Sequence, residues 1–336
     1  MLFRSYLLKR FISSFIVLIS VVTISFFITR VVPGDPISLW VGNHPSAKQI
    51  EIAKKELGLD RPLANQFFSY VKSLSRGDLG LSIRTKQPVS FELKRRFTAT
   101  LELVSLSIIF STIIGYPLGL FAGIYKRKKF DKVISFISYL GLSFPVFWSG
   151  MILQIIFFSY LDLLPLQGRL SLELENYERI TGLILFDSIL HFNWELFIDA
   201  FRHLLLPCAA LVFSIFGIIV RTSRTALINT MSEPYFETYT SYGFSKKDIV
   251  FKTAYKNTLI PTITIIGLSY GLLLGGTFLI ESIFNWPGIG QFCVLSILTN
   301  DYPSIVGVTL LYAISYTIIN FTIDILYVLI DKRIEL

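Results

Sequence analysis

Six long apolar runs constrain the fold of this 336-residue chain more than any other feature. A helix rises 1.5 Å per residue, so it needs about 20 mostly apolar residues to cross a hydrocarbon layer of roughly 30 Å. Runs of this kind lie between ionisable residues at 11–29, 103–125, 133–161, 204–220, 257–280 and 302–323. The fourth is the shortest, and the last stays apolar past Asp324 to Ile330. We therefore expect an all-α polytopic membrane protein with six transmembrane helices, the first of them an uncleaved anchor.

The composition excludes several other classes of protein. Hydrophobic residues make up 53% of the chain and charged residues only 16%, which does not fit a soluble protein. The net charge of +8 comes from short clusters between the apolar runs, so nucleic acid is not an expected partner. Two cysteines and three histidines leave little for a disulfide framework or a metal site. No Gly-Lys dipeptide occurs, so there is no Walker A loop, and we predict no catalytic residue and no cofactor in this chain.

Lysine and arginine counts predict the orientation, because basic residues near helix ends stay on the cytoplasmic side. The ends of the chain and the connections 126–132 and 221–256 hold 16 of them, whereas the connections 162–203 and 281–301 hold three. Both termini are therefore expected in the cytoplasm. Residues 30–102 hold twelve, but a connection of this length largely escapes the charge rule.

These expectations divide the chain into three parts. Residues 1–30 form the cytoplasmic N-terminus and the first transmembrane helix, residues 31–97 form a small extracytoplasmic segment, and residues 98–336 form a five-helix core with a cytoplasmic loop at 221–258. In the outer segment, Ala47–Leu57 has helical spacing, and prolines and glycines mark turns after it. In the core, Ile184–Phe201 has the composition of an amphipathic segment on the outer interface.

The cytoplasmic loop has the signals of two short helices joined by a turn. Pro234 suits a first helical turn, Gly243 suits the left-handed residue that ends a helix, and Ser245 with Asp248 forms a capping pair for the next one. A solvated hairpin is the simpler interpretation. Aromatic residues are enriched where partners dock, however, and the loop exposes five of them in our reading: Tyr235, Phe236, Tyr239, Tyr242 and Phe244.

This loop resembles the signature of a known family, the permease subunits of ATP-binding-cassette importers for peptides and nickel. That signature is Glu-Ala-Ala, three residues, a glycine, and a Leu/Ile-Pro pair about 18 residues later. Here Glu237 is followed by Gly243, and Pro261 of the Ile260-Pro261 pair stands 18 residues after the glycine. Thr238 and Tyr239 replace the two alanines.

The resemblance is closest to the dipeptide-permease branch and extends over most of the chain. The stretches that carry it are Val32–Pro36, Glu56–Asp60, Gly77–Gly80, Thr98–Leu103, Phe144–Trp148, Leu164–Arg169, Thr181–Gly182, Asn285–Gly290 and Asp301–Pro303.

The resemblance implies a permease that moves dipeptides or oligopeptides across the cytoplasmic (inner) membrane of a prokaryote. Its partners would be a second, related permease, two ATPase subunits that bind ATP and magnesium, an extracytoplasmic substrate-binding protein and membrane lipid. Nickel or a metal chelate is the alternative cargo, and an ATP-independent secondary transporter is the alternative from another class. Such transporters usually carry ionisable residues within their spans, whereas Asp324 stands nearly alone here.

The resemblance also implies site residues. Coupling to the ATPase would involve Tyr235, Phe236, Glu237, Thr238, Tyr239, Gly243, Phe244 and Pro261. The small or polar character of residues within the third and fifth runs, rather than the resemblance, makes these the candidates for the substrate pathway: Ser143, Pro145, Ser149, Gln154, Gly271 and Gly275. Ordinary helix packing is the competing interpretation for these six and for Gly267 and Gly276, because small residues let helices approach closely. A structural role near the inner interface is the expectation for Asp324.

Overall fold

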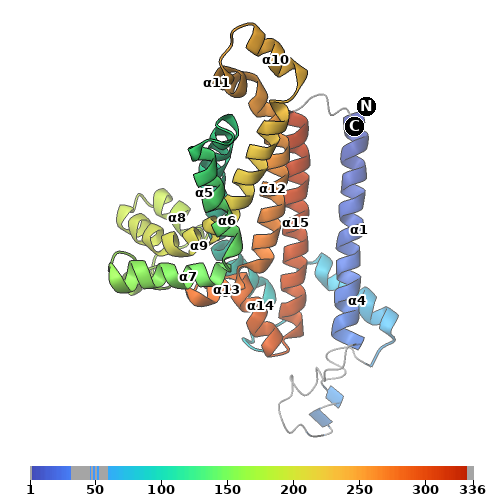
Figure 1. Cartoon of the computed structure of the whole chain (residues 1–336). Helices are drawn as coiled ribbons and strands as arrows, with labels where there is room; N and C mark the ends of the chain where they lie inside the picture. Colours follow the sequence, from blue (N-terminus) through green and yellow to red (C-terminus); the bar gives the residue numbers. More distant parts are fainter. Residues whose placement is uncertain (1, 32–45, 47, 50, 53–59, 331–336) are drawn as a thin grey trace. The chain divides into compact units, whose positions relative to one another are not determined.

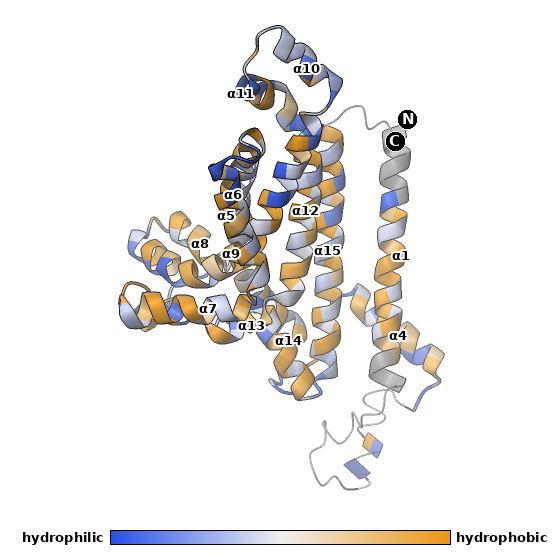
Figure 2. Ribbon diagram, in the orientation of Figure 1, coloured by the Kyte–Doolittle hydropathy of each residue, from blue (hydrophilic) through white to orange (hydrophobic). Residues whose placement is uncertain are grey.

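The computed structural model describes residues 2–31, 46, 48–49, 51–52 and 60–330. This part of the chain is helical apart from turns and one isolated β-bridge, Leu81 with Pro88. Five helices are long and apolar enough to cross a membrane, and a bent pair brings the number to six (Figures 1 and 2). The chain forms two compact units, Phe3–Phe97 with Gln291–Thr317, and Thr98–Gly290 with Ile318–Leu336. The expected all-α membrane fold is confirmed.

In the first unit, an aromatic cluster joins the outer segment to the first helix. α1 (Leu2–Val31) buries Phe26 against α4 (Leu63–Ser75), with its ring centre 5.2 Å from that of Phe67 and 5.6 Å from that of Tyr70. Pro62, which we expected only to mark a turn, stands at the N-cap of α4, a helix that we did not predict. The helix expected at Ala47–Leu57 and the stretch Val32–Pro36 lie largely or wholly outside the described residues.

A buried aspartate joins two motif stretches of the first unit that are far apart in the sequence. Asp301 directly precedes α15 (Tyr302–Ile330), which follows α14 (Ile289–Leu298). Its carboxylate accepts hydrogen bonds from Ser82 Oγ (2.5 Å) and the Ile83 N–H (2.9 Å), and from Ser304 Oγ in the first turn of α15 (2.8 Å). The turn before Ser82 needs Gly80, whose φ is +80°. Asp301 therefore fixes the outer segment to the start of the last helix.

In the second unit, α9 (Trp194–Thr230) packs against α6 (Lys129–Ser143), α7 (Val146–Gln154), α8 (Ile184–Leu190) and α12 (Tyr255–Gly276). The helix α5 (Val89–Ile124) approaches α9 through three glycines in a four-residue repeat. A Cβ atom at Gly115, Gly119 or Gly123 would press on Ile219, Ser223 or Leu227, respectively. We did not predict this stripe, although its small-xxx-small spacing is a known signal of close helix contact.

The third apolar run is not one straight helix. α6 ends at Ser143. α7 and the π-helix that continues it, η1 (Ile155–Tyr160), run in a direction that differs from that of α6 by 101°. The break lies at Phe144, whose backbone is extended (φ −86°, ψ 134°) because a residue that precedes proline is disfavoured in the helical region. The third run, expected as one span, is therefore broken in the middle, and Pro145 is the reason.

The fourth run was underestimated. α9 has 37 residues and includes a window of mean hydropathy 2.4, the highest among the five candidate spans of the described residues. It passes through Arg202 and His203 at one end and Arg221 at the other, which is why counting between ionisable residues shortened it. The segment Ile184–Phe201, for which we predict a place on the outer interface, is not one continuous helix. It divides into α8 and the first turns of α9, and the Asn193 side chain caps α9 by accepting a hydrogen bond from the Leu196 N–H (3.0 Å).

The fifth span is continuous with the loop before it. α11 (Lys246–Ile249), the π-helix η3 (Val250–Ala254) and α12 form one uninterrupted helical segment of 31 residues. Pro261 lies inside α12 rather than at its start. A short helix, α13 (Phe278–Ile283), follows its other end.

Candidate functional site

The candidate coupling segment, residues 233–261, begins with a short helix that one aromatic side chain anchors to the core. In α10 (Pro234–Ser241), Phe236 is 4% exposed and packs with Leu227 of α9 and with Ile249 and Val250 after the turn. The prediction that Phe236 is exposed is therefore wrong. An eight-residue helix has too few residues for its sequence to show which face meets the core. Phe236 instead holds the segment against the ends of the spanning helices.

The local signals of this segment are confirmed. Pro234 occupies the first turn of α10, and Gly243 has φ +87° after its C-terminus. The Gly243 N–H bonds to the Thr240 carbonyl (3.0 Å), which closes the turn. Ser245 caps α11 by accepting a hydrogen bond from the Asp248 N–H (3.2 Å).

The exposed surface of the coupling segment is aromatic. Tyr242 is 77% exposed, and Tyr239 and Phe244 are exposed and pack edge to face with ring centres 5.7 Å apart. Glu237 and Thr238 also lie exposed on α10. This surface combines the Glu237 carboxylate with large aromatic rings, and aromatic residues are enriched where partners dock.

Tyr235 connects the short helix to the fifth span. It is half-buried, and its hydroxyl oxygen accepts a hydrogen bond from Asn257 Nδ2 in α12 (3.1 Å). Partial burial raises the pKa of Tyr235 above its ordinary value, so the hydroxyl is neutral at physiological pH. α10 is thus fixed to α9 through Phe236 and to α12 through Tyr235.

The polar pathway candidates in the third run bond to their own surroundings. Ser143 Oγ donates to the Tyr139 carbonyl (2.8 Å), and Ser149 Oγ donates to the Val146 carbonyl (2.7 Å). Gln154 Nε2 donates to the carbonyls of Leu166 (3.0 Å) and Ile283 (3.2 Å). The two contacts of Gln154 fasten the end of α7 to the segment after it and to α13. Pro145 causes the bend described above.

The glycines of α12 differ in their surroundings. A Cβ atom at Gly267 would overlap the Ile323 side chain of α15, so close helix packing explains this position. A Cβ atom at Gly275 or Gly276 would meet no atom within 4 Å, so packing within the described chain does not explain these two. Gly271 is partly buried in the same helix. Gly275 therefore remains a pathway candidate.

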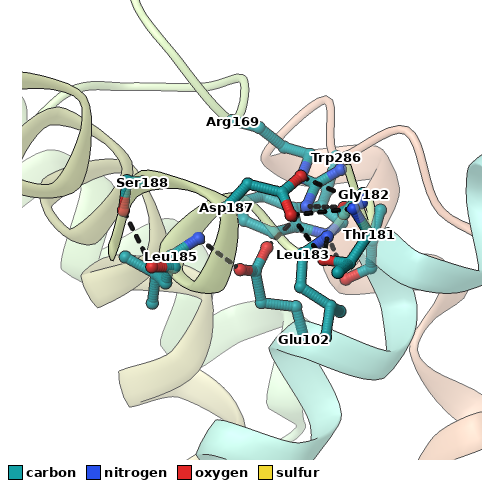
Figure 3. Close-up of polar contacts among 10 residues, drawn as sticks. Glu102, Arg169, Thr181, Gly182, Leu183, Leu185, Asp187, Ser188 and Trp286 are labelled. Atoms are coloured by element: carbon teal, nitrogen blue, oxygen red, sulfur yellow. Dashed lines mark hydrogen bonds and ion pairs between the residues drawn. The ribbon is translucent and has the colours of Figure 1, made fainter. Parts of the chain in front are cut away.

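A buried ion pair lies where the segment after the third span returns to the core (Figure 3). Arg169 Nη2 donates to Glu102 Oε2 in α5 (2.5 Å), and both side chains are largely buried. The other oxygen, Glu102 Oε1, accepts the Leu185 N–H of α8 (2.8 Å). The Arg169 guanidinium also lies over the Trp286 ring, 5.4 Å from its centre. A charge is costly to bury without a partner, so these contacts keep the pair in one geometry.

Asp187 fixes the adjacent turn. Its carboxylate accepts hydrogen bonds from the Thr181 N–H (2.8 Å) and hydroxyl (2.5 Å) and from the Gly182 N–H (3.0 Å), as Figure 3 shows. Gly182 has φ +83°, a conformation that glycine adopts without strain. Its carbonyl accepts a hydrogen bond from Arg169 Nη2 (3.2 Å), which joins this turn to the ion pair.

A further buried carboxylate organises the Asn285–Gly290 stretch. Glu281 accepts hydrogen bonds from Thr100 Oγ1 (2.7 Å) and Thr277 Oγ1 (2.8 Å), and Thr100 Oγ1 in turn accepts the Ile289 N–H (2.8 Å). A Cβ atom at Gly288 would overlap the Glu281 carboxyl group. The Trp286 indole N–H completes the arrangement by donating to the Ala99 carbonyl (2.9 Å).

These buried acids were not among the predicted site residues. The stretches that carry the family resemblance contain Glu102, Arg169 and Trp286, but the sequence alone assigned them no role. One signal in the sequence could have pointed to these three residues. They lie in motif stretches that flank apolar runs, where polar side chains are candidates for buried contacts. In the described part of the chain, no group of three or more His, Cys, Asp or Glu side chains is arranged to hold a metal ion.

Comparisons with known proteins identify the family of this chain. Residues 115–336 match the family described as "Binding-protein-dependent transport system inner membrane component", and residues 2–104 match the N-terminal region of such membrane components. The chain is 39% identical over 334 residues to a "Probable D,D-dipeptide transport system permease protein" of Escherichia coli (strain K12), covering 99% of this chain and 98% of that one.

Two further relatives show the range of the similarity. A "Di/tripeptide transport system permease protein" of Pseudomonas aeruginosa (strain UCBPP-PA14) is 38% identical over 316 residues, covering 94% of both chains. A "Glutathione transport system permease protein" of Escherichia coli O6:H1 is 32% identical over 331 residues, covering 98% of this chain and 99% of the relative. With its spanning helices, and with family matches that cover nearly its whole length, this chain belongs to the family of inner membrane components of binding-protein-dependent transport systems.

Proposed function

We propose that this chain is the permease subunit of an ATP-binding-cassette importer that moves dipeptides or oligopeptides across the cytoplasmic membrane. The observation that carries the proposal is the similarity over nearly the whole chain to permeases named for dipeptides, di- and tripeptides and glutathione. The compounds in these three names are all short peptides or resemble short peptides in chemistry. The similarity covers the spans and the coupling segment alike.

In the proposed assembly this chain pairs with a second, related permease. Two ATPase subunits bind ATP, one of them docks on the surface of α10 around Glu237, and an extracytoplasmic protein delivers the peptide. The physical support is the fixation of α10 to both α9 and α12, because a docked element that is held at two points transmits the movement of its partner.

Uptake of a radiolabelled dipeptide tests the cargo and the assembly. We expect cells that express all five proteins, with two different permeases, to accumulate the dipeptide, and cells that lack this chain to fall to background. Doubling this chain in place of its partner should not restore uptake. Uptake by an assembly with two copies of this chain would refute the pairing of two different permeases. If cells that lack this chain lose nickel uptake but keep normal dipeptide uptake, the metal-chelate alternative would be favoured.

Cysteine labelling tests the proposed orientation, with both termini and the coupling segment in the cytoplasm. In a C208S/C293S background, single cysteines replace Leu172, which is 84% exposed, or Lys246, which is also exposed. We expect a membrane-impermeant maleimide to label position 172 in intact cells and position 246 only after permeabilisation. Labelling of position 246 in intact cells would reverse the topology.

A further inference from the structure

The turn between α5 and α6 concentrates positive charge. Four consecutive basic residues, Lys126–Lys129, and then Lys132 follow the last residue of α5, and all five are exposed. The turn has a fixed backbone: the Lys128 N–H bonds to the Tyr125 carbonyl (2.9 Å), and Arg127 has φ +67°. Figure 2 shows it as a hydrophilic turn next to apolar helices.

The one acidic residue of this turn does not neutralise the exposed cations. Asp131 is buried and accepts two hydrogen bonds from Arg224 of α9, Nε at 2.6 Å and Nη2 at 2.9 Å, and one from the Arg127 N–H at 2.7 Å. Its charge is therefore balanced by Arg224. Among the described residues, none of the five exposed side chains forms a salt bridge.

The coupling segment adds a further cation at the same place. Lys128 Nζ lies 5.5 Å and Lys247 Nζ 5.8 Å from the centre of the Tyr125 ring, although Lys247 belongs to α11. We name Lys126, Arg127, Lys128, Lys129, Lys132 and Lys247 the basic patch. Like charges gathered in this way favour an anion among them.

The surroundings of the basic patch indicate an amphiphilic anion. The basic patch directly follows the apolar run that ends α5, a candidate membrane span. In the proposed orientation, this position lies at the depth of the lipid headgroups. An exposed apolar face of α6 begins beside it, with Phe130, Val133 and Phe136 at helical spacing. An acidic protein surface would match only the cations of the basic patch. An anionic lipid matches both the cations and the adjacent apolar face.

We propose that the basic patch binds the phosphate headgroup of an anionic phospholipid in the cytoplasmic leaflet and, through Lys247, ties the coupling segment to the membrane surface. The proposal rests on the orientation given under the proposed function. Each basic residue near an anionic surface contributes about a fivefold preference, so three of them give about 100-fold.

Native mass spectrometry of the full-length chain, purified with its partner permease and delipidated in detergent, tests this binding. The lipids are phosphatidylglycerol and phosphatidylcholine, and inorganic phosphate serves as competitor. We expect wild type to retain phosphatidylglycerol selectively and K126Q/K128Q/K129Q to lose about 100-fold of that selectivity. The matched variant K126R/K128R/K129R keeps the charge and should keep the selectivity, while Lys247→Gln should lose about fivefold.

Three results would overturn the proposal. These are unchanged selectivity in the glutamine triple variant, displacement of the lipid by millimolar inorganic phosphate, and failure of the triple variant to recover the ATPase subunits in a separate pull-down although it retains the lipid, which would make the basic patch a protein docking surface. The readout does not depend on transport. Selective lipid binding without dipeptide uptake would therefore support this inference and contradict the proposed cargo.

Discussion

Gly243→Val should abolish peptide uptake while leaving the permease in the membrane at its normal abundance. Gly243 has φ +87°, and a β-branched residue there is strained because its side chain crowds the backbone. No atom lies within 4 Å of a Cβ atom built at this position, so the effect comes from the backbone and not from a clash. The turn would open and change the angle between α10 and α11.

The matched control is Gly243→Asn, because asparagine tolerates the left-handed conformation. We expect Gly243→Asn to retain most uptake and Gly243→Val to lose it together with recovery of the ATPase in pull-downs. Equal uptake in the two variants would show that the turn conformation has no part in coupling.

The charge on α10 is tested in the same preparation. Glu237→Lys should reverse an attraction to a basic ATPase pocket, with loss of uptake and of ATPase co-purification. Glu233→Lys changes an equally exposed acid at the N-cap of the same helix and serves as control. Normal values for Glu237→Lys would remove the coupling role from this residue, because an isolated solvated charge contributes little.

Arg169→Met should be among the most destabilising single substitutions in this chain. It leaves the Glu102 carboxylate buried without its cation, which costs about 3–5 kcal/mol for a buried pair. The Gly182 carbonyl and the Trp286 ring would lose contacts at the same time. We expect a clear fall in the melting temperature of the detergent-solubilised protein, measured by fluorescence-detected size exclusion.

Two further variants test this assignment. Lys252→Met breaks the exposed Lys252–Asp248 pair (3.8 Å), which should change the free energy of unfolding by no more than about 1 kcal/mol and leave the melting temperature close to that of wild type. The double variant Arg169→Met/Glu102→Leu removes both charges and should recover part of the loss, because replacing a buried pair with apolar residues is often tolerated. A melting temperature for Arg169→Met equal to that of Lys252→Met would contradict a structural role of the ion pair.

The parts of the structure that depend on nearby residues could be predicted from the sequence. The turn at Gly243, the cap at Ser245 and the position of Pro234 each follow from the backbone preferences of one or two residues. The last span, to Ile330, follows from an apolar run with few interruptions. For these features, local sequence and local structure carry the same information.

Other features depend on contacts between distant residues. Hydropathy averages over a window, so it did not register that Pro145 turns the third run by 101°. The contact of Arg169 with Glu102 spans 67 residues, and nothing in either motif states which acid the arginine meets. Phe236 was placed on the wrong face because its burial depends on Leu227 and Ile249, which lie outside its own helix.

The continuity of α11, η3 and α12 determines how far a small movement at one end extends. A helical segment of 31 residues is about 46 Å long at 1.5 Å per residue, and no loop interrupts it between Lys246 and Gly276. A tilt of about 5° around the Lys246 end would shift the Gly276 end by about 4 Å on the same geometry. That shift is comparable to the width of a peptide backbone, so in the proposed assembly a slight rotation beside the ATPase subunits would be enlarged to the scale of the cargo at the opposite end of the helix.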